Sequence, residues 1–157
     1  MKTALIIISI IILIIVGYLV VLSKNSQTGK AAGLVSGKLQ ACPDTPNCLC
    51  SEQNDDTDHF TPPIDISHSS ASESLKILKE IITGLNGEIQ TDNGLYVSAI
   101  FSSSLFGFVD DFEMRVDLNH SVIHIRSASR VGRGDLGANK KRIELIKKLY
   151  LEKPANG

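Results

Sequence analysis

A chain of 157 residues accommodates one domain and an appendage, and its net charge of −1 conceals a strong separation of charge. Residues 1–42 carry four lysines and no acid, residues 43–113 carry 13 acids and two lysines, and residues 114–157 carry ten Lys or Arg and four acids. This asymmetry predicts pairing of acidic and basic parts within one fold, a basic patch that binds an anion, or both. Aromatic residues do not alternate with the basic ones, and no P-loop or dinucleotide fingerprint is present. The sequence therefore predicts no nucleic-acid partner and no cofactor.

The segment from Ala4 to Leu22 reads ALIIISIIILIIVGYLVVL and carries no charge. As a helix it is about 29 Å long, close to the hydrocarbon thickness of a bilayer. A cleaved signal peptide usually has a shorter apolar region and a small-residue cleavage site, whereas SKNSQ follows here. We therefore predict a single transmembrane anchor over residues 1–23. The flanking lysines do not set its orientation.

Residues 24–40 are rich in Ser, Gly, Lys and Ala, so we predict a flexible linker between the anchor and a soluble domain over residues 41–153. Residues 154–157 are expected to form a tail. The domain begins with ACPDTPNCLCS, in which turn-forming residues between Cys42 and Cys48 allow the two thiols to approach. We predict a Cys42–Cys48 disulfide that contributes roughly 2 kcal/mol, and a free thiol at Cys50.

The other uses of these cysteines fit less well. Zinc needs four ligands, and the usual C-x2-4-C spacing is absent, although His59 and His68 could be recruited. A catalytic thiol at Cys50 has no paired base that the sequence identifies. LQAC resembles a lipoprotein cleavage box, but it lies far beyond the apolar run. We predict no metal site, and the disulfide favours a domain outside the cytoplasm, in the periplasm or at the cell surface.

A helix is predicted from Ser70 to Gly84, where Ser70 and Glu73 fit a capping box ahead of an apolar stripe. The period of the apolar residues then changes to two in residues 95–103, 111–118 and 122–127. These segments are predicted to be antiparallel strands with one apolar and one polar face. Shorter extended segments are expected at residues 60–66 and 87–91.

The register of one hairpin follows from this alternation. A two-residue turn at Asn119 and His120, with Asn at positive φ, pairs Val116 with Ile123 and Met114 with Ile125. The same register sets Glu113 opposite Arg126 and Arg115 opposite His124. A slip of one residue would mix the two faces, so the register is well specified.

The last helix is predicted to begin near Asp135, a good N-cap, and to end near Leu151. Its sheet-facing residues are expected to be Leu136, Ile143, Ile146, Leu149 and Tyr150. The predicted fold class is α+β: an N-terminal transmembrane helix, then a small domain with one antiparallel sheet and two helices packed on its apolar face.

Three blocks of the sequence carry a resemblance to a known family: GKLQACPDTPNC, FGFVDDFEMRVD and VIHIRSASRVGRGDLGANKKRI. Together they resemble the family called domain of unknown function 1499, over roughly Gly33 to Leu149. The resemblance implies a bacterial-envelope or plastid setting and no particular reaction. In that family the cysteine block typically continues Val-Ser-Ser, whereas Leu49, Cys50 and Ser51 follow here.

The basic block from Arg126 to Arg142 is the best candidate for a binding site. Arginines, hydroxyl groups and glycines precede a helix start, a combination that suits a phosphate or carboxylate. The predicted anion-binding residues are Arg126, Ser127, Ser129, Arg130, Arg133 and Asp135. The structural alternative pairs Arg126 with Glu113, and Arg130 with Asp110 or Asp111.

We accordingly expect a membrane-anchored, extracytoplasmic and non-catalytic domain that binds an anionic ligand or an envelope protein. One alternative is a hydrolase or transferase acting on an envelope molecule, with Asp110, Asp111, His124, Arg126 and Arg130 at its site. Another is a structural subunit of a membrane complex, which an exposed apolar patch would favour.

Overall fold

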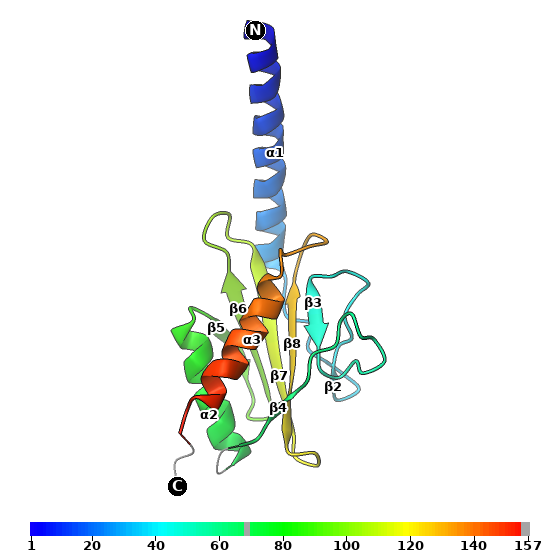
Figure 1. The fold of residues 1–157 in the computed structure, drawn as a ribbon, viewed down its shortest axis with the longest axis vertical. Coiled ribbons are helices and arrows are strands. Elements are labelled where there is room, and N and C mark those ends of the chain that lie inside the picture. Colours follow the sequence, from blue (N-terminus) through cyan, green and yellow to red (C-terminus); the bar gives the residue numbers. More distant parts are fainter. Residues whose placement is uncertain (68–69, 155–157) are drawn as a thin grey trace.

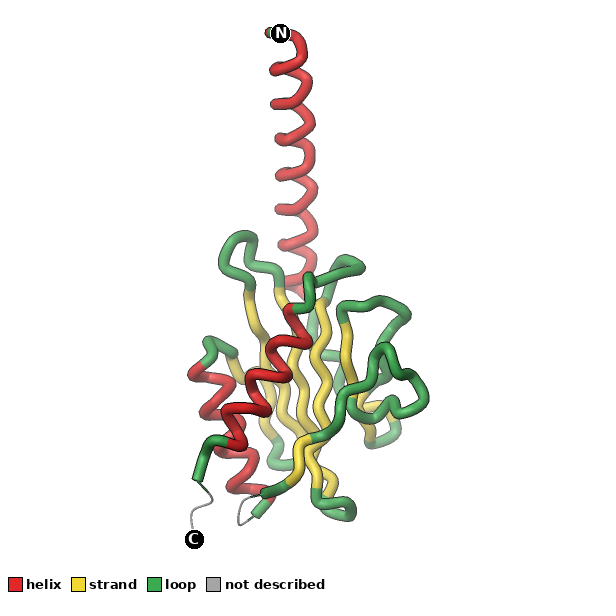
Figure 2. The backbone as a smooth tube through the Cα atoms, viewed as in Figure 1, coloured by secondary structure: helices red, strands yellow, loops and turns green. Residues whose placement is uncertain are grey.

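The computed structural model describes residues 1–67 and 70–154, so His68 and all of the predicted tail except Pro154 lie outside the described residues. Helix α1 (Lys2–Thr28) projects from one end of a domain in which two helices cover one face of a sheet (Figures 1 and 2). The other elements are β1 (Leu34–Val35), β2 (Lys38–Leu39), β3 (Cys48–Cys50), β4 (Ile64–Asp65), α2 (Ala71–Gly84), β5 (Glu88–Asp92), β6 (Tyr96–Ser102), β7 (Val109–Asp117), β8 (Val122–Ser129) and α3 (Ala138–Leu151). The α+β class is confirmed.

Helix α1 is long and apolar enough to cross a membrane. It continues past the predicted boundary at residue 23, because Ser23 and Ser26 are buried against the domain. The hydroxyl of Ser26 donates to Ser23 O at 2.7 Å and accepts from Val109 N at 3.1 Å. Residues 24–40 contain the end of helix α1 and the β1–β2 hairpin, in the segment for which the sequence predicted a flexible linker.

The prediction of one sheet was wrong, because β1 and β2 form a separate two-stranded sheet. Their turn consists of Ser36 and Gly37, both at positive φ, which is the geometry of a tight two-residue hairpin. The main sheet has six strands in the order β3-β8-β7-β6-β5, and β4 pairs with the start of β8. Its ladders are antiparallel, with an isolated parallel bridge between Cys50 and Phe60.

The predicted register of the β7–β8 hairpin is confirmed: Val116 pairs with Ile123, and Glu113 pairs with Arg126. The predicted turn was wrong in its details. The ladder ends at the Asp117–Val122 pair, so four residues connect the strands, and the residue at positive φ is Ser121 rather than Asn119.

The core lies between the sheet and the two helices. Its main residues are Val97, Ala99, Phe101, Phe112, Met114, Val116, Ile123 and Ile125 of the sheet, Leu75, Leu78, Ile81 and Ile82 of α2, and Ile143, Ile146 and Tyr150 of α3. Helix α2 begins as predicted, with Glu73 N donating to Ser70 Oγ. Leu95, Leu118 and Leu136 were expected on apolar faces but are exposed, because each lies just outside its element, where the chain turns away from the core.

The second face of the sheet is polar, as predicted, and it is covered. Tyr96, Ser98, Glu113 and Arg126 on this face are all buried. The segment that follows α1, together with the β1–β2 hairpin, lies over them, and Gly33 N donates to Glu113 Oε1 at 2.7 Å. The sheet therefore has a hydrophobic core on one side and a buried polar layer on the other.

Candidate functional site

Glu113 is the centre of the buried polar layer. Its side chain is fully buried, and one carboxylate oxygen accepts from both Tyr96 Oη and Gly33 N at 2.7 Å. The other oxygen accepts from Arg126 Nη1 at 2.9 Å. Burial and the hydrogen bond to the Glu113 carboxylate raise the pKa of Tyr96 far above its ordinary value. This cluster joins three neighbouring strands of the sheet, β6, β7 and β8, to the segment that follows α1.

Arg130 and Asp111 form a second ion pair on the same face. Arg130 Nε and Nη2 donate to the two oxygens of Asp111 at 2.9 and 2.7 Å. Arg130 Nη1 also donates to Ser26 O at 3.0 Å, so the pair connects the end of β8 to the end of α1. Asp110 points to the other face, where it pairs with Arg142 at 2.8 Å.

A cleft of about 430 Å³ opens between the segment that follows α1 and the polar face of β5 and β6. Its lining residues are Gly29, Lys30, Ala31, Gly33, Gln90, Thr91, Tyr96, Ser98, Asp111 and Arg130. Among the described residues that line it, Asp111 is the only acid, and both of its oxygens already bind Arg130. Lys30 is exposed at this cleft and forms no salt bridge with a described residue. Cationic and hydroxyl groups therefore dominate its chemistry.

The six residues predicted to bind one anion do not converge. Strand β8 continues to Ser129, so its alternate side chains point to opposite faces. Arg126 and Arg130 reach the polar layer, whereas Ser127 and Ser129 bind Asn139 beneath α3. Arg133 is exposed on the loop beyond the strand. Of the predicted set, only Arg130 lines the cleft described above.

The start of α3 also differs from the prediction. The helix begins at Ala138 with Gly137 as its N-cap, three residues after the predicted Asp135. Asp135 nevertheless caps the helix, because its two oxygens accept from Gly137 N at 3.0 Å and Asn139 N at 2.8 Å. The backbone donors expected to hold an anion are thus bound to a carboxylate of the chain itself.

Of the residues in the hydrolase or transferase alternative, Asp110 lies on the helix-covered face, and the other four lie on the polar face, where Arg126 and Asp111 are already bound in ion pairs. His124 lies apart from Arg130, and its Nδ1 is 3.1 Å from Ser51 Oγ. Asp117 Oδ2 lies 3.8 Å from His124 Nε2, so the fold brings together a serine, a histidine and an aspartate that sequence reasoning did not link. Ser51 is only 1% exposed and binds Ile125 N, which leaves a substrate no access to its hydroxyl. Burial lowers the pKa of His124.

The cysteines pair as predicted: Cys42 and Cys48 form a disulfide, and Cys50 is free and buried. A disulfide is typical of an oxidising compartment. Within residues 1–67 and 70–154, no three His, Cys, Asp or Glu side chains are grouped as metal ligands would be. His68, one of the two histidines considered for zinc, lies outside the described residues.

Cys50 should resist alkylation in the native protein. The side chain is fully buried, and this burial raises the pKa of its thiol, so both access and thiolate fraction are low. We expect iodoacetamide to leave Cys50 unmodified in the folded full-length protein and to modify it completely in urea, as measured by mass spectrometry. A Ser36→Cys variant provides an exposed thiol as the matched control. Equal rates at Cys50 and at residue 36 would contradict the buried position.

Sequence reasoning missed most of the cleft. Lys30 was assigned to the linker, and Gln90, Thr91, Tyr96 and Ser98 were not considered for a site. The pair Ser36–Gly37, preceded by Leu34 and Val35, was an available hairpin signal that would have shown the chain folding back at this point. Nothing in the sequence indicates which face of the sheet that hairpin covers.

The fold and the cleft define an α+β domain that follows an N-terminal apolar helix and carries a cationic cleft on the polar face of its sheet. The sequence profile of the family described as protein of unknown function (DUF1499) matches residues 38–149, and the chain belongs to this family. The resemblance found in the three sequence blocks is therefore confirmed. Among curated proteins, none matches the chain.

Proposed function

We propose that this protein is a single-pass membrane protein whose extracytoplasmic domain binds a small anionic ligand in the cleft beside α1. The apolar helix α1 supports the anchor, and the disulfide supports an oxidising side of the membrane. Binding rather than chemistry is proposed because the cleft offers donors and cations without a nucleophile paired to an exposed base.

The observation that carries the proposal is the arrangement of Arg130 and Lys30. Asp111 and Ser26 O hold the Arg130 guanidinium at the cleft through three of its five N–H groups, so the remaining two can meet a ligand. Lys30 adds a second positive charge that no described acid neutralises. Ser98 and Thr91 supply hydroxyl groups, which suit the oxygens of a phosphate or carboxylate.

Inorganic phosphate titrated into the full-length protein in detergent tests this proposal. We expect saturable binding, followed by calorimetry or by amide chemical shifts of Ala31 and Gly33. Lys30→Gln should weaken the affinity by about tenfold or more, since a hydrogen bond to a charged group contributes about 1.5–3 kcal/mol. The Lys30→Gln protein should be as stable as the wild type, because Lys30 is exposed.

Lys38→Gln is the matched control, because Lys38 is exposed on β2 and does not line the cleft. It should bind phosphate as the wild type does. Absence of saturable binding to the wild type, or equal affinity of the Lys30 and Lys38 variants, would refute the cleft as an anion site.

A further inference from the structure

Two loops stand beside α1 at the end of the sheet from which it projects (Figure 1). One connects β6 to β7, over residues 103–108, and the other connects β8 to α3, over residues 130–137. In the first loop, Phe106 O accepts from Ser23 Oγ and Gly107 O accepts from Gln27 Nε2. Ser23 directly follows the apolar run, so this loop lies at the level where the hydrocarbon would end.

Each loop holds an exposed leucine. Leu105 is 82% exposed and Leu136 is 97% exposed. The backbone of Leu136 has a φ of 55°, a left-handed conformation that is unfavourable for a residue with a side chain. The hydrogen bonds from Gly137 N and Asn139 N to Asp135 hold this turn in place. The fold thus keeps a leucine outside the core, where water would surround it.

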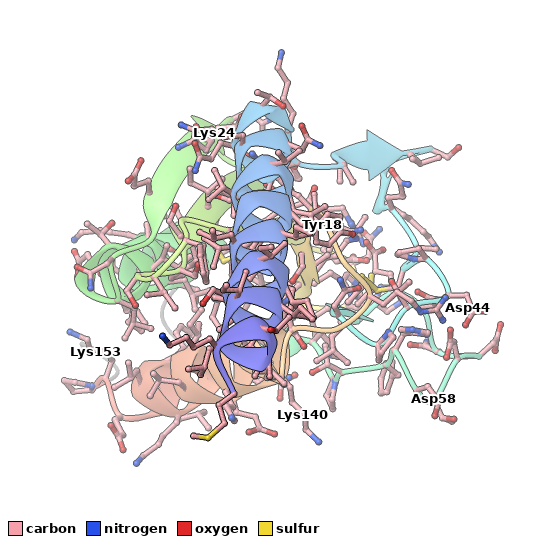
Figure 3. The ribbon with its side chains drawn as sticks, turned by 90° about the horizontal axis from the view of Figure 1, so that it is seen from above. Tyr18, Lys24, Asp44, Asp58, Lys140 and Lys153 are labelled. Atoms are coloured by element: carbon pink, nitrogen blue, oxygen red, sulfur yellow. A yellow bond between two sulfur atoms is a disulfide. The ribbon has the colours of Figure 1, made fainter. Side chains whose placement is uncertain are left out.

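A crevice of about 420 Å³ separates α1 from the second loop. Leu19 and Leu22 form one wall, and Phe108, Val131 and Leu136 contribute to the others. In the view from above, α1 projects in front of the domain (Figure 3). Leu19 lies about 4–5 Å further into the apolar run than Leu22, so the crevice opens at the depth where acyl chains begin.

The charges at this end favour an anionic surface. Lys24, Arg133 and Lys140 are exposed, and Lys24 and Lys140 lie at opposite edges of the molecule in the view from above (Figure 3). The two acids that line the crevice are already engaged: Asp110 pairs with Arg142, and Asp135 caps α3. Cations near a bilayer surface are attracted to the headgroups of anionic lipids.

We propose that the domain rests directly on the bilayer through these two loops. Leu105 and Leu136 insert among the lipids, an acyl chain of an anionic phospholipid occupies the crevice, and its phosphate lies against Arg133. The proposal goes beyond the anion cleft, which lies on another part of the domain. It depends on α1 being the membrane anchor.

The chain has no tryptophan, so single tryptophans can report the depth of chosen residues. The experiment uses Leu136→Trp, Leu118→Trp and Leu13→Trp in the full-length protein, reconstituted into phosphatidylcholine–phosphatidylglycerol vesicles with brominated acyl chains. Leu118 is the matched control: it is 64% exposed and lies in the β7–β8 loop, at the opposite end of the sheet. Leu13 lies in the middle of the apolar run and tests the anchor itself.

We expect the brominated acyl chains to quench the fluorescence of the tryptophans at residues 13 and 136. The fluorescence of the tryptophan at residue 118 should not be quenched. If the tryptophan at residue 13 is quenched but the one at residue 136 is quenched no more than the one at residue 118, α1 is supported as the membrane anchor. The insertion of the two loops into the bilayer is then refuted. If residue 13 is not quenched, both the anchor and the docked loops are refuted. Brominated vesicles of phosphatidylcholine alone should quench the tryptophan at residue 136 less than the vesicles that contain phosphatidylglycerol. Arg133→Gln should remove this difference between the two kinds of vesicle. Equal quenching of the Leu136→Trp protein in both kinds of vesicle would refute the proposal that the bound lipid is anionic.

Discussion

Replacement of Glu113 by glutamine should lower the free energy of unfolding by about 3–5 kcal/mol, because it leaves a buried arginine without its counter-charge. Glu113 is 0% exposed, and it accepts hydrogen bonds from Tyr96, Gly33 and Arg126. The amide of glutamine keeps the shape but offers one acceptor in place of two. Within the part of the chain that the structure describes, Arg126 Nε is the only buried side-chain nitrogen or oxygen without a hydrogen-bond partner, so Arg126 depends strongly on Glu113.

Urea denaturation of the full-length protein in detergent, followed by circular dichroism, measures this loss. Glu88→Gln is the matched control, because Glu88 is exposed on the edge strand β5, and its effect should stay within about 0.5 kcal/mol. Combining Glu113→Gln with Arg126→Gln should restore part of the stability, since the second change removes the unpaired charge. A Glu113→Gln protein as stable as the Glu88 control would show that the buried pair does not hold the polar layer together.

Arg130→Ala and Asp111→Ala should each destabilise the protein by about 3 kcal/mol, because each leaves the other charge unpaired at a largely buried site. Arg130→Ala additionally frees Ser26 O near the end of α1. The double variant should lose less than the sum of the two single losses, by about 1–3 kcal/mol, because the pair acts as one unit.

Arg133→Ala serves as the control for Arg130→Ala, since Arg133 is exposed on the loop that follows and should change stability by less than about 0.5 kcal/mol. The same denaturation series in urea measures all four proteins. Strict additivity of the two single losses would mean that Arg130 and Asp111 do not depend on each other. In that case their arrangement at the cleft would need another cause.

The sequence by itself determined those features that depend on neighbouring residues. Alternation of period two, read across a hairpin, specified that Val116 faces Ile123, because a slip of one residue would have moved the apolar side chains to the wrong face. Ser70 and Glu73 specified the start of α2 through a hydrogen bond between residues three apart. The turn-forming residues between Cys42 and Cys48 similarly predicted the disulfide.

The shortest strands showed no period of their own, and although an extended segment was expected at residues 60–66, where β4 lies, neither β1 and β2 nor β3 was predicted. Strands β1 to β4 contain two or three residues each, too few to show a period, and β3 forms because Leu49 and its neighbours find the free edge of β8 far along the chain. The predicted strand that became β8 ended two residues early. For that reason Ser129 and Arg130 were assigned to one site, although they point to opposite faces.

Only the tertiary structure decided what covers the polar face of the sheet and hence where the cleft lies. Lys30 and Gly33 reach the sheet because α1 continues to Thr28 and the chain then folds back over Glu113. The choice of Asp111 rather than Asp110 as the partner of Arg130 follows from the alternation of β7, but only the position of α3 supplies Arg142 to Asp110. These pairings join residues separated by tens of positions, and no local pattern encodes them because the contacts arise only when the elements pack.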